Sequence, residues 1–220
     1  MIKRALLLAL ITTLPLFAGV ELTGFGGFQW NGSHEFEWYE DYNGSRYYKS
    51  GNFDLEHDGN FGIFINKDLG GGTQLELNWT GNKSIAKWRT NSDHSGIPRD
   101  GNYSVFSNYW LIGGLKYFGS GANRFKPFAN GGIGVMSFIF DDEMIDPQTF
   151  FGVSVGLGAK MMLTDRIGLR FGSRFLIPIN FDGVGMSFGT GGVSAGAYGH
   201  VPVLQGDIHG GLIINLGGGK

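Results

Sequence analysis

Six charged residues stand within stretches of otherwise apolar and small residues, apart from the charge-rich segments of the chain. They are Glu21, Glu76, Lys116, Lys160, Arg170 and Arg174. The set contains both signs, so its members can form ion pairs if the fold brings them together. A charge removed from water must be paired or hydrated, because an isolated one is costly. The same stretches contain polar residues that could hydrogen-bond to these charges, namely Gln29, Asn78, His209 and Asn215.

Catalytic chemistry has weaker support in the sequence. The chain has no cysteine, and most of its five histidines lie between the apolar stretches rather than within them. The run Asp93-His94-Ser95 contains the residue types of a hydrolase triad. Neighbouring residues on a strand point to opposite faces, however, so this run does not form a triad by itself. We therefore expect that the protein is not an enzyme.

Two acidic runs could supply the oxygen ligands that divalent cations prefer. They are Glu35–Asp41, which also contains aromatic residues, and Asp141–Glu143 with the nearby Asp146. Runs of this kind are more often solvated loops, so we expect no metal site and no cofactor. The net charge of −2 lacks the basic stripe of a nucleic-acid-binding protein, so we also expect no nucleic acid partner.

The residues around the six charges alternate between large apolar and small or polar types, which is typical of β-strands. From Phe151 to Leu163 every second residue is apolar, and Gly152, Gly156 and Lys160 occupy the alternate positions. Eight such segments occur, each of about 10 residues, a length that suits a tilted membrane-spanning strand. They cover 20–31, 60–67, 73–82, 104–118, 125–138, 151–163, 167–177 and 207–216.

The connections between these segments alternate between long and short. Long or medium connections cover 32–59, 83–103, 139–150 and 178–206, whereas 69–72, 119–124 and 164–166 are short. A transmembrane barrel has short periplasmic turns and longer extracellular loops, which explains this alternation. The sequence therefore predicts an all-β fold, an eight-stranded antiparallel up-and-down transmembrane β-barrel. A soluble barrel with an internal ligand cavity is the alternative.

The composition indicates which face of this barrel meets lipid. The chain has 40 glycines among 220 residues, 15% aromatic residues and only 16% charged residues. An eight-stranded barrel has an interior just wide enough for side chains, so glycine and the few charges belong inside. Aromatic residues near the strand ends would form two interfacial girdles. We assign Phe28, Trp30, Trp79, Tyr109 and Phe151 to the outer girdle, and Tyr117 and Phe125 to the periplasmic girdle.

The N-terminus has the pattern of a secretory signal peptide. Lys3 and Arg4 precede the apolar run Ala5–Leu14, and the small residue Ala18 suits the position before a cleavage site. The uncharged stretch is short for a spanning helix, which needs about 20 residues. We therefore expect a signal peptide at residues 1–18 and a single barrel domain at residues 19–220.

Several stretches resemble small outer-membrane β-barrels of Gram-negative bacteria, of the outer membrane protein A transmembrane-domain and opacity-protein type. Lys126–Gly134 is similar to the fifth-strand pattern of that group, and Phe151–Arg170 is similar to its sixth-to-seventh-strand hairpin. The resemblance implies an eight-stranded barrel in the bacterial outer membrane. It also implies an assembly signal in the last strand, at His209, Gly211, Ile214 and Leu216, which barrel-assembly machinery would recognise. Many relatives end on a terminal Phe, whereas this chain continues past Leu216.

The resulting functional hypothesis is a structural or envelope-interaction protein. The charged residues would form a polar plug in the lumen, outer-membrane lipid and lipopolysaccharide would surround the wall, and extracellular loops would bind a ligand. The first loop is the best binding candidate because it contains Trp38, Tyr39, Tyr42, Tyr47 and Tyr48. Two alternatives remain open: a narrow pore gated by Glu76 with Arg170 or Lys116, and a lipid-modifying enzyme.

Overall fold

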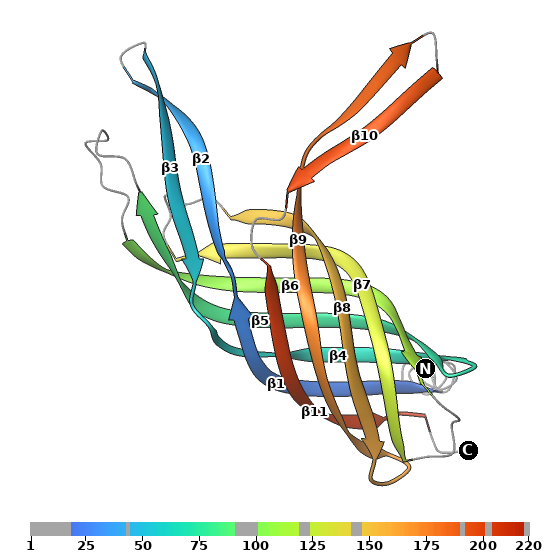
Figure 1. Ribbon diagram of the computed structural model, residues 1–220. Coiled ribbons are helices and arrows are strands. Elements are labelled where there is room, and N and C mark those ends of the chain that lie inside the picture. Colours follow the sequence, from blue (N-terminus) through green and yellow to red (C-terminus); the bar gives the residue numbers. More distant parts are fainter. Residues whose placement is uncertain are drawn as a thin grey trace, which may run out of the picture.

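Eight strands of the described part of the chain form one closed barrel (Figure 1). The structure, a computed structural model, describes residues 19–42, 45–90, 101–118, 124–141, 147–189, 192–200 and 204–217. The barrel strands are β1 (Val20–Asn31), β4 (Asp58–Gly70), β5 (Thr73–Thr90), β6 (Gly101–Tyr117), β7 (Phe125–Phe140), β8 (Gln148–Met162), β9 (Ile167–Gly189) and β11 (Gln205–Asn215). The expected signal peptide and the run Asp93-His94-Ser95 lie outside the described residues.

The barrel closes because its first and last strands pair with each other. Each barrel strand is antiparallel to the barrel strands before and after it, and β1 pairs with both β4 and β11. The closing seam runs from Glu21↔Asn215 to Asn31↔Gln205 without a register shift. Closure suits a lipid environment, because an open sheet edge would leave backbone groups unpaired in hydrocarbon. The predicted eight-stranded antiparallel barrel is confirmed.

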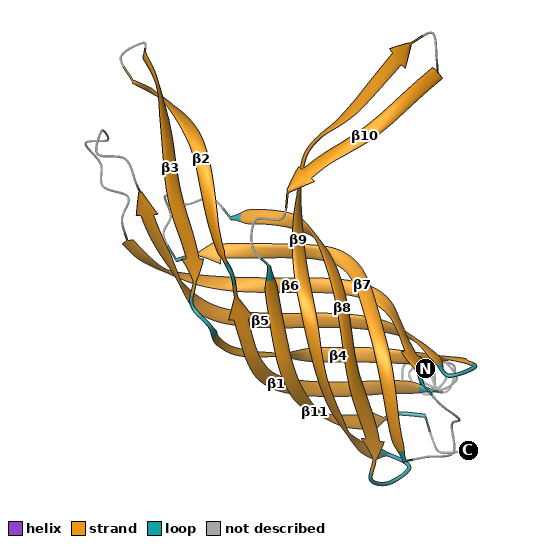
Figure 2. Cartoon of the chain, in the orientation of Figure 1, coloured by secondary structure: helices purple, strands orange, loops and turns teal. Residues whose placement is uncertain are grey.

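Three connections that the sequence pattern indicated as long loops contain paired strands instead. β2 (Ser33–Tyr42) pairs with β3 (Ser45–Leu55), β5 and β6 extend beyond the predicted segments, and β9 continues alongside β10 (Gly192–His200). Figure 2 shows these extensions projecting from one end of the barrel, which we call the hairpin end. The apolar alternation predicts only the part of a strand that has an apolar outer face, whereas backbone pairing continues beyond it.

The opposite end of the barrel, which we call the turn end, carries short connections. In the β4–β5 turn, Gly70, Gly71 and Gly72 have φ angles of 82°, 60° and 73°, which residues with a Cβ rarely adopt. In the β8–β9 turn, the hydroxyl of Thr164 accepts hydrogen bonds from the backbone N–H groups of Arg166 and Ile167, at 3.2 and 3.0 Å. These turns hold consecutive strands in register at the turn end.

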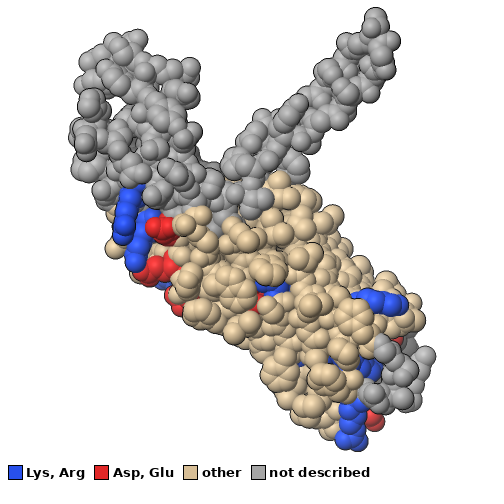
Figure 3. Space-filling model, viewed as in Figure 1, with Lys and Arg blue, Asp and Glu red and all other residues tan. Residues whose placement is uncertain are grey.

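The wall has an apolar outer face, and Figure 3 shows one side of it, with few charges between the two ends of the barrel. Leu157, Ile133 and Trp110 point outward and are 64%, 53% and 53% exposed. Alternate residues of the same strands are buried inside, such as Lys160 and Tyr109. Among the described residues there is no helix with the length and apolar character needed to cross a membrane.

Glycine lines the inner face where neighbouring strands approach too closely for a side chain. A Cβ atom at Gly27, Gly62, Gly113 or Gly134 would lie 2.2, 2.2, 1.9 or 2.0 Å from a carbonyl oxygen of an adjacent strand. Real Cβ atoms essentially never come so close to another heavy atom. These glycines therefore keep the barrel narrow, and the remaining inward positions fill its interior.

Candidate functional site

The barrel interior contains three ion pairs, two of them with both partners buried, which follow one another from the turn end toward the hairpin end. They are Glu21–Lys160, Glu76–Arg170 and Asp207–Arg174. The strands that contribute them are β1, β5, β8, β9 and β11, so residues far apart in the sequence meet in the lumen. The structure thus brings together five of the six charged residues singled out in the sequence.

The pair nearest the turn end joins β8 to β1. Nζ of Lys160 lies 2.5 Å from Oε2 of Glu21 and also donates to Oε1 of Gln74 on β5, at 2.8 Å. Lys160 is buried, whereas Glu21 borders a cavity of about 770 Å³ that Asp68 and Lys126 also line. This cavity is the mouth of the lumen at the turn end, and it is lined by Glu21 and Gln74, the two residues that Lys160 contacts.

The middle pair crosses the full width of the barrel, because β5 and β9 are four strands apart in the ring of eight. Nη1 of Arg170 donates to Oε2 of Glu76 at 2.7 Å. Glu76 also accepts hydrogen bonds from the side-chain amides of Asn66 at 2.9 Å and Asn130 at 2.7 Å. The carboxylate is therefore bonded to β9, β4 and β7 at once.

Arg170 has no exposed surface, and aromatic rings cover its guanidinium. Its Cζ atom lies 3.6 Å from the ring centroid of Phe64 and 4.8 Å from that of Phe128. Its Nε and Nη2 atoms have no hydrogen-bond partner. The rings and the Glu76 carboxylate together replace the water that this cation loses on burial.

The third pair joins β9 to β11. Nε of Arg174 donates to Oδ1 of Asp207 at 3.2 Å, and Nη2 contacts the other carboxylate oxygen. Asp207 also accepts from the Asn60 amide at 2.9 Å and lies 3.0 Å from Nδ1 of His209. Nη1 of Arg174 reaches across the lumen to Oδ1 of Asn78, at 2.8 Å. This pair therefore belongs to a hydrogen-bonded network of four strands.

Neutral groups fill the lumen between the third ion pair and the hairpin end. The hydroxyl of Tyr109 donates to Gln205 at 2.7 Å and accepts from Gln29 at 3.0 Å, and Gln205 donates to Asn31 at 2.9 Å. Beyond this polar layer lies an apolar cluster of Leu55, Ala86, Val105 and Phe138. Lower down, a cavity beside Glu76 and Arg174 has a volume of only about 10 Å³, which is roughly the space of one water molecule.

Lys116 does not take part in the lumen network, contrary to the prediction. Its side chain is exposed, and Nζ donates to the Gly71 carbonyl at 2.7 Å and to the Thr73 hydroxyl at 3.0 Å. β6 buries Tyr109 and Leu115, so its odd-numbered residues face inward and Lys116 faces outward. The assumption that strand charges face the lumen fails here because the strand end lies beside a turn, where an outward charge reaches water.

The inward positions of β6 also correct two predicted girdle residues. Tyr109 is fully buried in the lumen, and Tyr117 faces the turn-end mouth, where the Nζ atoms of Lys126 and Lys160 lie 5.6 and 5.8 Å from its ring centroid. Trp110 takes the outward position instead. The sequence pattern was ambiguous here because both faces of β6 carry large residues, with Leu111 and Leu115 inside and Trp110 and Ile112 outside.

The other five predicted girdle residues occupy outward positions. Phe28 and Phe125 are exposed, whereas Trp30, Trp79 and Phe151 are partly exposed. The indole N–H of Trp79 donates to Oδ1 of Asn108 on β6 at 2.7 Å, and its ring lies 6.2 Å from that of Trp110. These contacts fix the Trp79 ring against the outer wall.

Residues 5–198 match the family model of the outer membrane protein beta-barrel domain. The chain belongs to this family. Outer membrane β-barrels have short turns in the periplasm and longer loops outside the cell, which predicts that the turn end is periplasmic and the hairpin end extracellular.

The architecture of this outer membrane β-barrel is similar to that of a solved outer membrane protein. The outer membrane protein OprG from Pseudomonas aeruginosa is 14% identical, with a TM-score of 0.55, over 90% of this chain and 95% of that chain. Neisserial surface protein A is 12% identical, with a TM-score of 0.46, over 90% and 97% of the two chains. Ail of Yersinia pestis is 11% identical, with a TM-score of 0.39, over 90% and 98%. No curated protein sequence matches the chain. The likeness to OprG concerns the fold alone.

Asp207, the partner of Arg174 in this outer membrane β-barrel, was not among the site residues predicted from the sequence. Asp207 is the third residue of β11 and shares its inward face with His209. The alternation that placed His209 inside would have placed Asp207 there too, but Asp207 stood at the boundary of the predicted strand. The amide residues Asn60, Asn66, Asn130 and Gln205 were missed as well, because uncharged polar residues are common in loops and turns as well as in a lumen.

The residues of the expected assembly signal lie on both faces of β11. His209 and Gly211 face the lumen, whereas Ile214, and Leu216 directly after the end of β11, are exposed on the outer side. A Cβ at Gly211 would lie 2.7 Å from the carbonyl oxygen of Gly24 on β1, so this glycine also permits the closing seam. Recognition by barrel-assembly machinery stays a prediction.

The described residues contain no group of three or more His, Asp or Glu side chains placed to hold a metal ion. Of the acidic runs considered for a metal, residues 142–146 lie outside the described part of the chain, and the side chains of 35–41 are not described either.

The buried dyad of His209 and Asp207 combines an acid and a base, but Arg174 also occupies that carboxylate. His209 and Asp207 are therefore part of the hydrogen-bond network that fills the lumen.

Proposed function

We propose that this outer membrane β-barrel is a structural and envelope-interaction protein with a plugged lumen. The observation that carries the proposal is the bracing between opposite walls. β5 and β9 lie opposite each other and are joined by Glu76–Arg170 and by Asn78–Arg174. A solute passing through the lumen would have to separate both contacts and leave buried charges without partners, which is costly.

A second brace lies closer to the extracellular end. Tyr109 on β6 and Gln205 on β11 also belong to opposite strands, and their side chains are hydrogen-bonded at 2.7 Å. The apolar cluster around Phe138 follows directly above it. The plug is thus built from ionic, neutral polar and apolar layers in sequence, each of which would obstruct a hydrated ion.

Planar-bilayer conductance tests the plug. We expect no single-channel steps from the folded wild-type protein or from Lys116→Ala, a matched variant whose exposed lysine lies outside the lumen. Steady or stepwise current from the wild-type protein would contradict the proposal. Glu76→Ala removes the ion pair between Glu76 and Arg170. The conductance of this variant shows whether that ion pair alone keeps the lumen closed.

A narrow gated pore is the second candidate, and the charge of the plug favours it. Ion pairs can exchange partners, and a polar mouth of about 770 Å³ at the periplasmic end is lined by Glu21, the partner of Lys160. This candidate requires discrete openings of the wild-type protein that change in Glu76→Ala and persist in Lys116→Ala. Silent wild-type bilayers leave the plugged barrel as the better account.

The envelope-interaction part of the proposal rests on the extracellular hairpins. β2 and β3 carry the aromatic residues of the first loop, with Tyr39 and Tyr48 paired across the hairpin. Aromatic side chains offer large contact areas at low entropic cost. We propose that this hairpin binds an extracellular or envelope ligand. A pull-down from intact outer-membrane fractions should lose its partner in Tyr39→Ser with Tyr48→Ser, and should retain it in Tyr198→Ser on β10.

Outer-membrane lipid, lipopolysaccharide and the barrel-assembly machinery complete the proposed partners. We propose no catalysis, and the lipid-modifying alternative has one direct test. Turnover of radiolabelled lipid by the purified barrel, abolished in Ser95→Ala, would establish that alternative, and the absence of turnover would remove it.

A further inference from the structure

The lipid-facing wall contains a groove with a floor of glycine. It has a volume of about 680 Å³, and Gly24, Gly26 and Gly210 lie along its bottom on β1 and β11. Gly26 and Gly210 are direct partners in the closing seam, and Gly24 pairs with Leu212 two residues further along. The groove therefore follows the seam where the first and last strands meet.

These outward glycines are not needed by the barrel itself. A Cβ at Gly24 would meet no atom within 4 Å, and the nearest contacts at Gly26 and Gly210 would be 3.8 and 3.6 Å, which are ordinary distances. The inward Gly27 and Gly211 differ, because a Cβ there would collide with neighbouring backbone. Side chains could therefore be present at Gly24, Gly26 and Gly210 without strain. Glycine at these three positions leaves the groove open.

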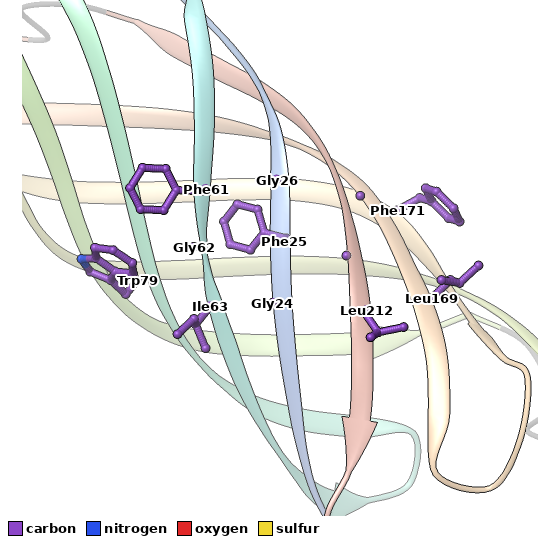
Figure 4. A pocket seen from close by; sticks show the side chains of 12 residues that line it. Gly24, Phe25, Gly26, Phe61, Gly62, Ile63, Trp79, Leu169, Phe171 and Leu212 are labelled. Carbon is purple, nitrogen blue, oxygen red and sulfur yellow. The ribbon is translucent and has the colours of Figure 1, made fainter.

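Aromatic and aliphatic side chains form the two sides of the groove (Figure 4). Phe61, Ile63 and Trp79 stand on one side of β1, and Leu169, Phe171 and Leu212 stand on the other. The rings of Phe61 and Trp79 are in edge contact, with centroids 5.7 Å apart. Because Trp79 is also hydrogen-bonded to Asn108, this side of the groove is rigid before anything binds.

A basic residue follows the groove on its extracellular side. Along the outer face of β5, Leu75, Leu77 and Trp79 are succeeded by Lys83, which is exposed. Four residues of a strand separate Trp79 from Lys83, about 13 Å at the usual rise. The next outward lysine, Lys87, is already paired with Glu56 at 2.6 Å. Lys83 is therefore the first outward-facing cation of β5 beyond Trp79, although it does not line the groove itself.

We propose that this groove is a binding site for a phosphorylated lipid of the outer leaflet, with one acyl chain on the glycine floor and a phosphate at Lys83. Tight packing, rather than the hydrophobic effect, selects one chain from the surrounding lipid, since both environments are apolar. The glycine floor and the fixed Trp79 ring supply that packing, and Lys83 adds charge complementarity. The inference rests on the proposed role of outer-membrane lipid as a partner and names its site.

Native mass spectrometry of the folded protein with bis-phosphorylated lipid A, and with its dephosphorylated form, tests the site. The wild-type protein should retain one molecule of lipid A. Gly26→Leu fills the groove and should reduce retention of both forms about tenfold. Lys83→Gln should reduce retention of the phosphorylated form about fivefold and leave the dephosphorylated form unchanged.

Gly114→Leu is the matched control, because Gly114 is also exposed and its nearest Cβ contact would be 3.8 Å away, but it lies on β6 outside the groove. It should retain lipid A like the wild-type protein, and heat-modifiable gel mobility confirms that each variant is folded. Wild-type protein that retains neither form overturns both the site and the lipid partner. If Gly26→Leu retains lipid A like the wild-type protein, the site alone is overturned. The site is also overturned if the wild-type protein is a dimer that Gly26→Leu converts to a monomer, because a second copy would then occupy the groove.

Discussion

Replacing Glu76 by alanine tests whether paired charge holds the lumen together. In Glu76→Ala, Arg170 keeps its charge with no exposed surface and loses the carboxylate oxygen 2.7 Å from Nη1. Breaking one partner of a buried ion pair costs about 3–5 kcal/mol. The rings of Phe64 and Phe128 remain, and cation–π contacts of about 1 kcal/mol each keep the loss toward the lower end of that range. We expect the free energy of unfolding to fall by about 3 kcal/mol.

Urea unfolding in lipid vesicles, followed by tryptophan fluorescence and gel mobility, measures this loss. The exposed pair Lys87–Glu56, with a 2.6 Å separation and side chains 38% and 40% exposed, supplies the control. Glu56→Ala should cost at most about 1 kcal/mol. In Glu76→Ala with Arg170→Met, no buried charge is left unpaired, so most of the stability should return. Equal losses in Glu76→Ala and Glu56→Ala, or no recovery in the double variant, would refute the reasoning.

Three further changes test other parts of the structure. Gly113→Val should prevent folding as judged by heat-modifiable mobility, because its Cβ would lie 1.9 Å from the Gly131 carbonyl oxygen, whereas Gly24→Ala, with no atom within 4 Å, should fold normally. Tyr109→Phe should lower the free energy of unfolding by about 1–3 kcal/mol, since buried Gln205 loses its donor, and urea titration measures the change. Lys116→Ala should change stability by less than about 0.5 kcal/mol in the same titration, and a larger loss would place Lys116 in the lumen network after all.

The sequence predicts the eight barrel strands well because the lipid outside imposes a strict alternation on them. β1 has the predicted bounds, Val20–Asn31, and the other strands begin or end a few residues away or continue beyond the prediction. The hairpins β2–β3 and β9–β10 were beyond this reasoning, because strands that pair outside the membrane need no apolar face. Their pairing depends on backbone hydrogen bonds, which any residue except proline can donate.

The candidate site was predictable where charge alone decides the inward face. Glu21, Glu76, Lys160, Arg170 and Arg174 stand out because lipid excludes them, and the structure places all five in the lumen. The pairing of these charges was not predictable, because it depends on how the strands are staggered around the ring. β6 is the opposite case. Both of its faces carry large residues, so only its packing against neighbouring strands shows which face points into the lumen.

The ion pairs of the lumen also connect early and late parts of the chain. Glu21 and Glu76 come from the first half of the sequence, while Lys160, Arg170 and Arg174, with Asp207, come from the second. The first half therefore brings two negative charges to the lumen, and the second brings three positive and one negative, a net of two positive charges. Neither half is electrically balanced alone. A truncated chain would carry unneutralised charge into the membrane, so the polar core makes insertion depend on a complete translation product.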